Sequence, residues 1–425
     1  MERPILHTVI TRIASTVFNF LIALLIARHA GPSVKGEVTL LITTIWFFIF
    51  FSNILGGQVL VYLIPRNKMQ LLIIPAYIWS VLVAGAGYVF LQFTPLVPAG
   101  YVSMVVVLSF LSSLLSIHYT VLLARKQISQ ANLLQIIPLI IQLIGVLACF
   151  YFLNIHDAGA YVYASLAGYS LTLLLSFFMI KKHIQIANIF RDLSFAELKT
   201  FSYGFPYQLT EILQLLQFRY YFYQLGLQQG SQYLGVFSIG ISILETVWII
   251  PRSVSTIHYV STSNSTEIKN EVARTIQLIK ICVALCFVIL LLIAAIPSSA
   301  YSFVFGPGFM DVKHAMRFLY PGILIYCIPI VISSFYLGIG QYKRLIVAHL
   351  CGLVTMIAFS YQLIPPYVMS GAGLAATISF SVSSLLLFIY FVMDNDLGVS
   401  QFIITRADID TAKNMVLYLK GKFKL

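Results

Sequence analysis

The chain has 425 residues, of which 60% are hydrophobic and only 9% are charged, whereas an ordinary soluble domain is about 25% charged. Long apolar runs follow one another with only short polar loops between them, which excludes a string of soluble domains joined by linkers. The net charge of +12 does not indicate nucleic-acid binding, because the basic residues mark loops rather than one solvated face. The composition therefore predicts an integral membrane protein.

Twelve apolar runs, each about as long as the 20 residues that cross the hydrocarbon layer, predict twelve transmembrane helices and an all-α fold. In chain order they cover residues 7–29, 37–63, 71–93, 100–124, 131–153, 158–180, 201–226, 232–257, 273–297, 312–338, 345–365 and 371–392. We expect an N-terminal six-helix lobe over residues 1–190, a C-terminal six-helix lobe over 191–392 and a basic tail over 393–425.

The distribution of basic residues predicts the orientation, because lysine and arginine are retained on the cytoplasmic side. Most of the 26 basic residues fall on the side of the amino terminus, and only Arg28, Lys35 and Lys313 fall outside. Both termini are therefore expected to be cytoplasmic. The basic tail mixes apolar and lysine residues, which suits either a helix on the membrane surface or a partly disordered segment.

A repeat links the two halves of the sequence. The segment GPSVKGEV begins at Gly31, and GSQYLGVF begins 199 residues later at Gly230 with the same glycine spacing. ARKQ, ending at Gln127, and GIGQ, ending at Gln341, each lie between the fourth and fifth predicted helices of their half. Since each half has six helices, corresponding helices run in the same direction and the repeat is parallel, as in many transporters.

Several segments resemble the polysaccharide-biosynthesis (O-antigen, Wzx-type) flippases of the multidrug/oligosaccharidyl-lipid/polysaccharide (MOP) exporter superfamily. These are ARHAGPSVKGEV from Ala27, RDLSFAELKTFSYGFP from Arg191, YLGVFSIGISILETVWIIP from Tyr233, FGPGF from Phe305, YPGI from Tyr320, LGIGQ from Leu337 and IPPYVMSGAGLAAT from Ile364. The resemblance covers most of the chain, although Ala30 stands where leucine is usual. It implies two lobes around a central cavity that opens alternately to either side, and an undecaprenyl-pyrophosphate-linked glycan as cargo.

A pyrophosphate that crosses the membrane needs cations, and the planar arginine side chain binds phosphate through two parallel hydrogen bonds. Arginine at the middle of a bilayer costs about 2.5–3.5 kcal/mol on insertion scales, so such residues usually face a cavity or a partner. Polar stripes on the first and seventh predicted helices fit this role. The predicted cavity residues are Arg12, Asn19, Arg28, Gln208, Glu211, Gln214, Arg219, Glu245 and Arg317.

Each of these residues has a structural alternative. Arg12 lies close enough to the cytoplasmic edge to extend its side chain to water, and Arg219 lies in an aromatic segment typical of a membrane interface. Arg28 suits an anchor at the outer end of the first helix. The repeat offset places Arg12 opposite Glu211, which suggests that this pair closes one side of the cavity.

The predicted function is secondary transport of an O-antigen or capsule repeat unit from the cytoplasmic to the periplasmic leaflet of a bacterial inner membrane. We expect coupling to H⁺ or Na⁺, no other cofactor, no metal site, no enzymatic activity and no nucleic-acid partner. Expected partners are the lipid-linked glycan, membrane lipids, a polysaccharide polymerase and a chain-length regulator. Two alternatives stay open: a drug or cation antiporter of the same superfamily, and a membrane-embedded polysaccharide polymerase.

Overall fold

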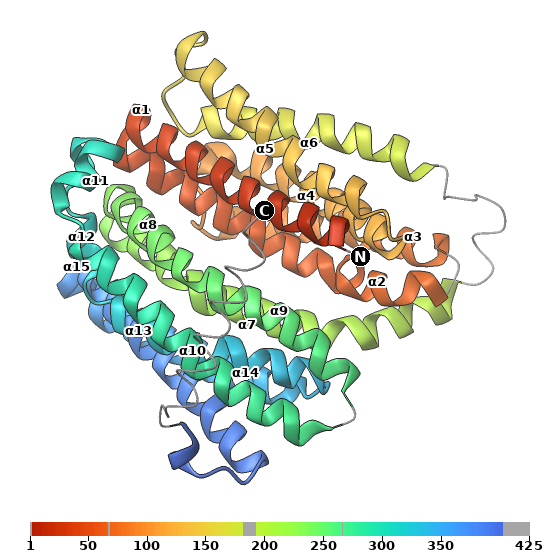
Figure 1. The fold of residues 1–425 in the computed structure, drawn as a ribbon. Helices are drawn as coiled ribbons and strands as arrows, with labels where there is room; N and C mark the ends of the chain where they lie inside the picture. The colour runs from red at the N-terminus through yellow and green to blue at the C-terminus, as the bar shows by residue number, and fades with distance from the viewer. Residues whose placement is uncertain (1, 67–68, 182–192, 266, 403–425) are drawn as a thin grey trace. The chain divides into compact units, whose positions relative to one another are not determined.

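The computed structural model describes residues 2–66, 69–181, 193–265 and 267–402, and within these ranges every regular element is a helix (Figure 1). Nine helical stretches of the described residues are long and apolar enough to cross a membrane, and two of them join pairs of predicted helices. The prediction of an all-α integral membrane protein is confirmed. Most of the basic tail, from residue 403, lies outside the described residues.

Contacts divide the chain into two compact units, the first of which contains residues 1–238 and 301–310. Its helices are α1 (Glu2–Gly56), α2 (Gln58–Leu63), α3 (Gln70–Phe93), α4 (Val102–Ala124), α5 (Ile128–Tyr151), α6 (Gly159–Ile180), α7 (Leu193–Gln229) and the first part of α8 (Ser231–Glu245). α7 thus packs with the first six helices. The six-helix lobes expected from the repeat stay a prediction.

The chain reverses direction inside α1, at Gly31. This residue has φ 80° and ψ −179°, a conformation that is essentially restricted to glycine. In Figure 1 the chain runs from the N-terminus along the red half of α1 and returns along the orange half to α2 at the starting end. Ile22 and Ile26 from the first half pack in one core cluster with Val38 and Leu41 from the second. The helices predicted over 7–29 and 37–63 therefore form a hairpin.

The second unit contains residues 239–300 and the chain from residue 311. Its helices are the end of α8, α9 (Ile249–Asn264), α10 (Ile268–Ala295), α12 (Val312–Met316), α13 (Tyr320–Ile325), α14 (Cys327–Gly338) and α15 (Tyr342–Asp394), while α11 (Ser298–Phe305) spans a boundary between the units. Trp248 is fully buried, donates a hydrogen bond to the Ile323 carbonyl (2.9 Å) and packs against Tyr326 and Phe380.

Several predicted boundaries need correction. The helix expected over 312–338 is broken into α12, α13 and α14, and a proline lies in the first turn of both α13 (Pro321) and α14 (Pro329), where its missing N–H costs no helical hydrogen bond. The segment expected as a loop after residue 297 contains α11. The amphipathic segment before residue 201 continues α7 as one helix from Leu193.

The two Gln-containing loops of the repeat adopt the same turn. The Gln127 N–H donates to the Leu122 carbonyl and the Gln341 N–H to the Tyr336 carbonyl, both at 2.9 Å. The residue before each glutamine has positive φ, 60° at Lys126 and 73° at Gly340. This left-handed residue together with the six-to-one hydrogen bond defines a Schellman helix end. The sequence match therefore corresponds to a shared local structure.

Candidate functional site

The two glycine segments of the repeat cross each other within the first unit. A Cβ atom on Gly36 would overlap the carbonyl oxygen of Ser231, and one on Gly235 would overlap that of Pro32. The contact is reciprocal, because Pro32 and Ser231 are equivalent in the repeat, as are Gly36 and Gly235. Reciprocal contacts of this kind characterise a two-fold interface. The crossing fixes α8 against the second half of α1.

From this crossing, α7 runs antiparallel to the second half of α1. A Cβ atom on Gly226 would lie 3.4 Å from the Leu40 side chain, and one helical turn further along α1 the hydroxyls of Thr44 and Tyr223 lie 3.0 Å apart. Near the other end, Gly204 approaches the backbone of Ile54. Small residues thus let the two backbones pack closely, which is typical of transmembrane helix pairs.

Lys35 lies at the start of this helix pair and is buried, with 6% of its surface exposed. Its Nζ donates a 2.9 Å hydrogen bond to Oγ1 of Thr39, one turn further along the helix. Thr39 lies about 12 Å along the helix from the turn at Gly31. The Lys35 side chain therefore points into the helix bundle, instead of extending toward water at the helix end as long basic side chains often do.

Arg219 of α7 lies within electrostatic range of Lys35. Its guanidinium also stands over the Phe222 ring, 5.2 Å from the centroid. Arg219 lies one helical turn beyond Tyr223, which pairs with Thr44, so its backbone is deeper in the bundle than Thr39. A buried lysine and a half-buried arginine therefore lie within electrostatic range of each other inside the first unit.

This arrangement favours an anionic ligand. Burial removes the water that stabilises a lysine or arginine charge, and two neighbouring like charges add repulsion. An anion between Lys35 and Arg219 would offset both costs. Polar side chains continue beside them, because Gln224 donates to the Tyr220 hydroxyl and Gln228 donates to Gln224, each at 2.8 Å.

Known structures share this arrangement of helices. The chain aligns with a multidrug resistance MATE family transporter of the MOP superfamily with a TM-score of 0.75 and 15% identity, covering 90% of this chain and 94% of the other. It aligns with the lipid II flippase MurJ with a TM-score of 0.71 and 14% identity, covering 94% and 89%. Its fold is that of the MOP-superfamily transporters.

A third structure with the MOP fold is a transporter from Pyrococcus furiosus that is described by the reverse polarity of its binding pocket. It aligns with a TM-score of 0.66 and 16% identity, covering 92% of this chain and 94% of the other. The sequence matches no protein-family model and no curated protein. At these identities the comparisons establish the fold.

Within this MOP fold, the first unit holds seven of the nine predicted cavity residues. They are Arg12, Asn19 and Arg28 on α1 and Gln208, Glu211, Gln214 and Arg219 on α7. The three residues of α1 are exposed, Gln208 is buried and the other three are half-buried. Arg12 also lies within electrostatic range of Tyr119 on α4. Their role as a cavity lining stays a prediction, as does the Arg12–Glu211 pair.

The other two predicted residues lie in the second unit. Glu245 is the half-buried last residue of α8, where the helix continues into a short 3₁₀ turn. Arg317 directly follows α12 and is exposed. The guanidinium carbon of Arg252, on α9, lies 5.4 Å from the centre of the Trp248 ring. The cavity role of Glu245 and Arg317 also stays a prediction.

Two features of the structure were not found from the sequence. Lys35 was assigned to an outer loop, because the second apolar run was expected to start at residue 37, whereas α1 resumes directly after Gly31. His258 and Glu271 fall just outside the predicted helices, although both lie in helices and are buried. The signal available in the sequence is a threonine one helical turn after each of these residues. The pairs are Lys35 and Thr39, His258 and Thr262, and Glu271 and Thr275.

His118 shows the opposite outcome, a histidine whose ring is held by neighbours. Its Nε2 lies 2.6 Å from the Tyr77 hydroxyl, and its Nδ1 lies 2.5 Å from Oγ of Ser176. The ring is fully buried among α3, α4 and α6. Both nitrogens thus have partners, which fits a structural role for this residue.

Proposed function

We propose that this chain is a flippase that moves an undecaprenyl-pyrophosphate-linked oligosaccharide, an O-antigen or capsule repeat unit, from the cytoplasmic to the periplasmic leaflet. The observation that supports the proposal is a buried lysine, Lys35, within electrostatic range of Arg219 inside a helix bundle with the MOP fold. A buried lysine charge with a second cation in range costs stability, and a phosphate-bearing cargo would offset that cost during binding.

The two side chains supply complementary chemistry for a pyrophosphate. Arg219 presents a planar guanidinium that binds two phosphate oxygens at once, and Lys35 supplies a compact ammonium group. The cargo's prenyl tail stays in the hydrocarbon layer, so only the charged and sugar parts need the polar surface of the protein. The amide and phenol groups of Tyr220, Gln224 and Gln228 offer donors and acceptors for sugar hydroxyls.

A drug or cation antiporter is the main alternative, because a multidrug transporter shares the fold. Lys35 and Arg219 would repel a cationic drug at the position where they would attract a phosphate. The MOP transporter from Pyrococcus furiosus, described by its reversed pocket polarity, is a precedent for different polarities on this fold. The cationic pair therefore favours anionic cargo. A membrane-embedded polymerase gains no support from these contacts.

We further propose a multi-pass protein of the bacterial inner membrane with both termini in the cytoplasm. In this orientation Gly31 and Gly230 lie at the periplasmic ends of their helices. Transport proceeds by alternating access as a secondary process driven by an ion gradient, without an enzymatic step. The glycan repeat unit is handed to a polysaccharide polymerase and a chain-length regulator.

Deletion of the gene followed by lipid analysis tests this proposal. Loss of a flippase leaves prenyl-linked repeat units in the cytoplasmic leaflet, whereas loss of a polymerase leaves single repeats on the outer surface. Complementation with Lys35→Met combined with Arg219→Gln should fail, while the exposed-residue control Lys343→Gln should restore export. Normal export with the double variant, at wild-type protein levels, would contradict the proposed cargo site.

A further inference from the structure

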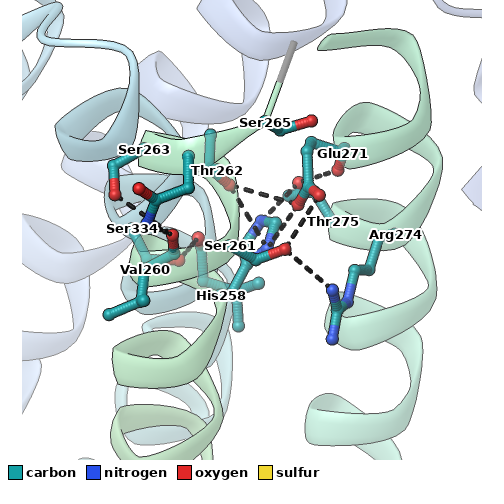
Figure 2. Close-up of polar contacts among 12 residues, drawn as sticks. His258, Val260, Ser261, Thr262, Ser263, Ser265, Glu271, Arg274, Thr275 and Ser334 are labelled. Atoms are coloured by element: carbon teal, nitrogen blue, oxygen red, sulfur yellow. Dashed lines mark hydrogen bonds and ion pairs between the residues drawn. The ribbon is translucent and has the colours of Figure 1, made fainter. Parts of the chain in front are cut away.

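The α9–α10 hairpin of the second unit contains a buried histidine–carboxylate pair that has no part in the cargo site (Figure 2). His258 of α9 is 1% exposed, and Glu271, in the first turn of α10, is 7% exposed. Nδ1 of His258 lies 3.3 Å from Oε2 of Glu271. Ionisable residues buried in transmembrane helices are rare and commonly mark proton or ion sites.

The far nitrogen of the His258 ring has the Thr275 hydroxyl as its partner. Oγ1 of Thr275 donates its single proton to the backbone carbonyl of Glu271 at 2.7 Å. Nε2 of His258 lies 2.8 Å from the same hydroxyl oxygen. Nε2 is the donor in the tautomer in which the hydroxyl proton stays on this carbonyl.

In that tautomer, the contact between Nδ1 and the carboxylate requires one more proton. An ionised carboxylate has only acceptors, and Nδ1 without a proton is an acceptor as well, so the two groups attract each other only when a proton lies between them. Ser261 donates to Oε1 of Glu271 at 2.9 Å, and Thr262 donates to Oε2 at 3.3 Å. The helices thus enclose a site that can hold one proton between His258 and Glu271.

We propose that His258 and Glu271 together bind and release the proton that couples the transport cycle. This inference rests on the proposed function and names its coupling ion. The site suits a proton better than a hard metal cation, because such cations prefer a shell of oxygen ligands and the histidine supplies a ring nitrogen instead.

Release of this proton has a structural consequence. The attractive contact between α9 and α10 becomes a contact between two acceptors, which weakens the hairpin. Thr262 of the same network packs tightly against α14, where a Cβ atom on Gly338 would lie 2.7 Å from the Thr262 Cβ. A change at the pair therefore reaches a third helix, and the proton favours one arrangement of the three over another.

The surroundings allow proton exchange with water. Glu271 and Arg274, both on α10, are the charged groups that face His258, and the sequence of α14 contains no Asp, Glu, Lys, Arg or His. Arg274 is exposed and donates to Oγ of Ser261 at 2.9 Å, and Ser261 in turn donates to Glu271. Because the guanidinium keeps its protons, exchange takes place at the half-exposed Ser261 hydroxyl, which lies one hydrogen bond from the carboxylate, as Figure 2 shows.

Hydrogen–deuterium exchange of the purified full-length chain tests the proton site without any cargo. The variants are Glu271→Gln, whose amide can donate to Nδ1 and accept from Ser261 without ionising, and the control Glu267→Gln, at an exposed carboxylate nearby. After correction for intrinsic rates, wild type and control should lose protection about tenfold or more in residues 255–264 and 268–276 between pH 5 and 9. The Glu271→Gln variant should keep its protection from exchange over this pH range. Protection that does not change with pH in wild type, or that falls equally in Glu271→Gln, would contradict the proposed proton site.

A proton count tests the coupling, with undecaprenyl pyrophosphate as the probe in weakly buffered detergent. Binding should exchange about one proton per wild-type molecule and none in Glu271→Gln. Binding without proton exchange, or an exchange that Na⁺ replaces, would overturn the coupling role. A probe that fails to bind would contradict the cargo proposal instead, while the exchange experiment still decides whether the pair holds a proton.

Discussion

Gly36 and Gly235 pass each other so closely that a Cβ atom on either would overlap the backbone of the opposite helix. The two residues are equivalent in the repeat. Gly36 approaches Ser231 and Gly235 approaches Pro32, and these two partners are equivalent in the repeat as well. The glycine spacing noticed in the sequence thus has a physical cause, because each glycine provides the space that the opposite backbone occupies.

Alanine at either glycine should separate α1 from α8. We expect Gly36→Ala and Gly235→Ala each to destabilise the protein by about 1–3 kcal/mol, the usual cost of overpacking. Gly85→Ala is the control, since no atom lies within 4 Å of a Cβ there, and alanine favours the helix by about 0.5–1 kcal/mol. Thermal unfolding in detergent measures all three. Equal Tm values for Gly36→Ala and Gly85→Ala would refute the close crossing.

Val368 provides a second test of the backbone. It interrupts α15 with φ 50° and ψ −121°, a conformation that favours glycine and costs a β-branched residue about 1–3 kcal/mol. Val368→Gly should therefore unfold at or above the wild-type Tm. The control Val354→Gly, at an exposed site in the same helix, should lower stability by about 1 kcal/mol because glycine weakens a regular helix. The same loss of Tm in both variants would argue against strain at Val368.

The charge of Lys35 should oppose stability while serving binding. Lys35→Met keeps the length of the side chain and removes a buried charge beside Arg219, so we expect a Tm about 2 °C or more above wild type. Binding of undecaprenyl pyrophosphate should weaken about tenfold or more, the loss expected for a charge-assisted contact. Calorimetry and a thermal shift assay measure the two effects. A less stable variant with unchanged affinity would show that Lys35 is a structural residue.

The sequence predicted the helices well because apolar runs of sufficient length have few alternatives in a membrane. Gly31 and Gly230, which begin the two repeat segments, lie between predicted helices, and both have positive φ. The buried polar residues near helix ends were harder to assign. Hydropathy locates the apolar centre of a helix, whereas Lys35, His258 and Glu271 lie in polar terminal turns that the apolar runs leave out.

The meeting of Lys35 with Arg219 was beyond sequence reasoning for a different reason. The two residues are far apart in the chain, and their approach depends on α7 packing along the second half of α1. That packing follows from small residues such as Gly226 and Gly204, whose effect appears only when the partner helix is known. The same holds for His258 and Glu271, which come together because α9 and α10 form a hairpin.

Transport by the purified chain in proteoliposomes tests the flippase proposal most directly. The probe is a fluorescent undecaprenyl-pyrophosphate-linked oligosaccharide, and a membrane-impermeant enzyme reports which leaflet holds its sugar. The wild-type chain should move the probe between leaflets well above the rate of empty liposomes, and Lys35→Met combined with Arg219→Gln should lose that activity while Lys343→Gln retains it. Movement of a cationic dye without movement of the lipid-linked glycan would contradict the proposal and identify a cation exporter.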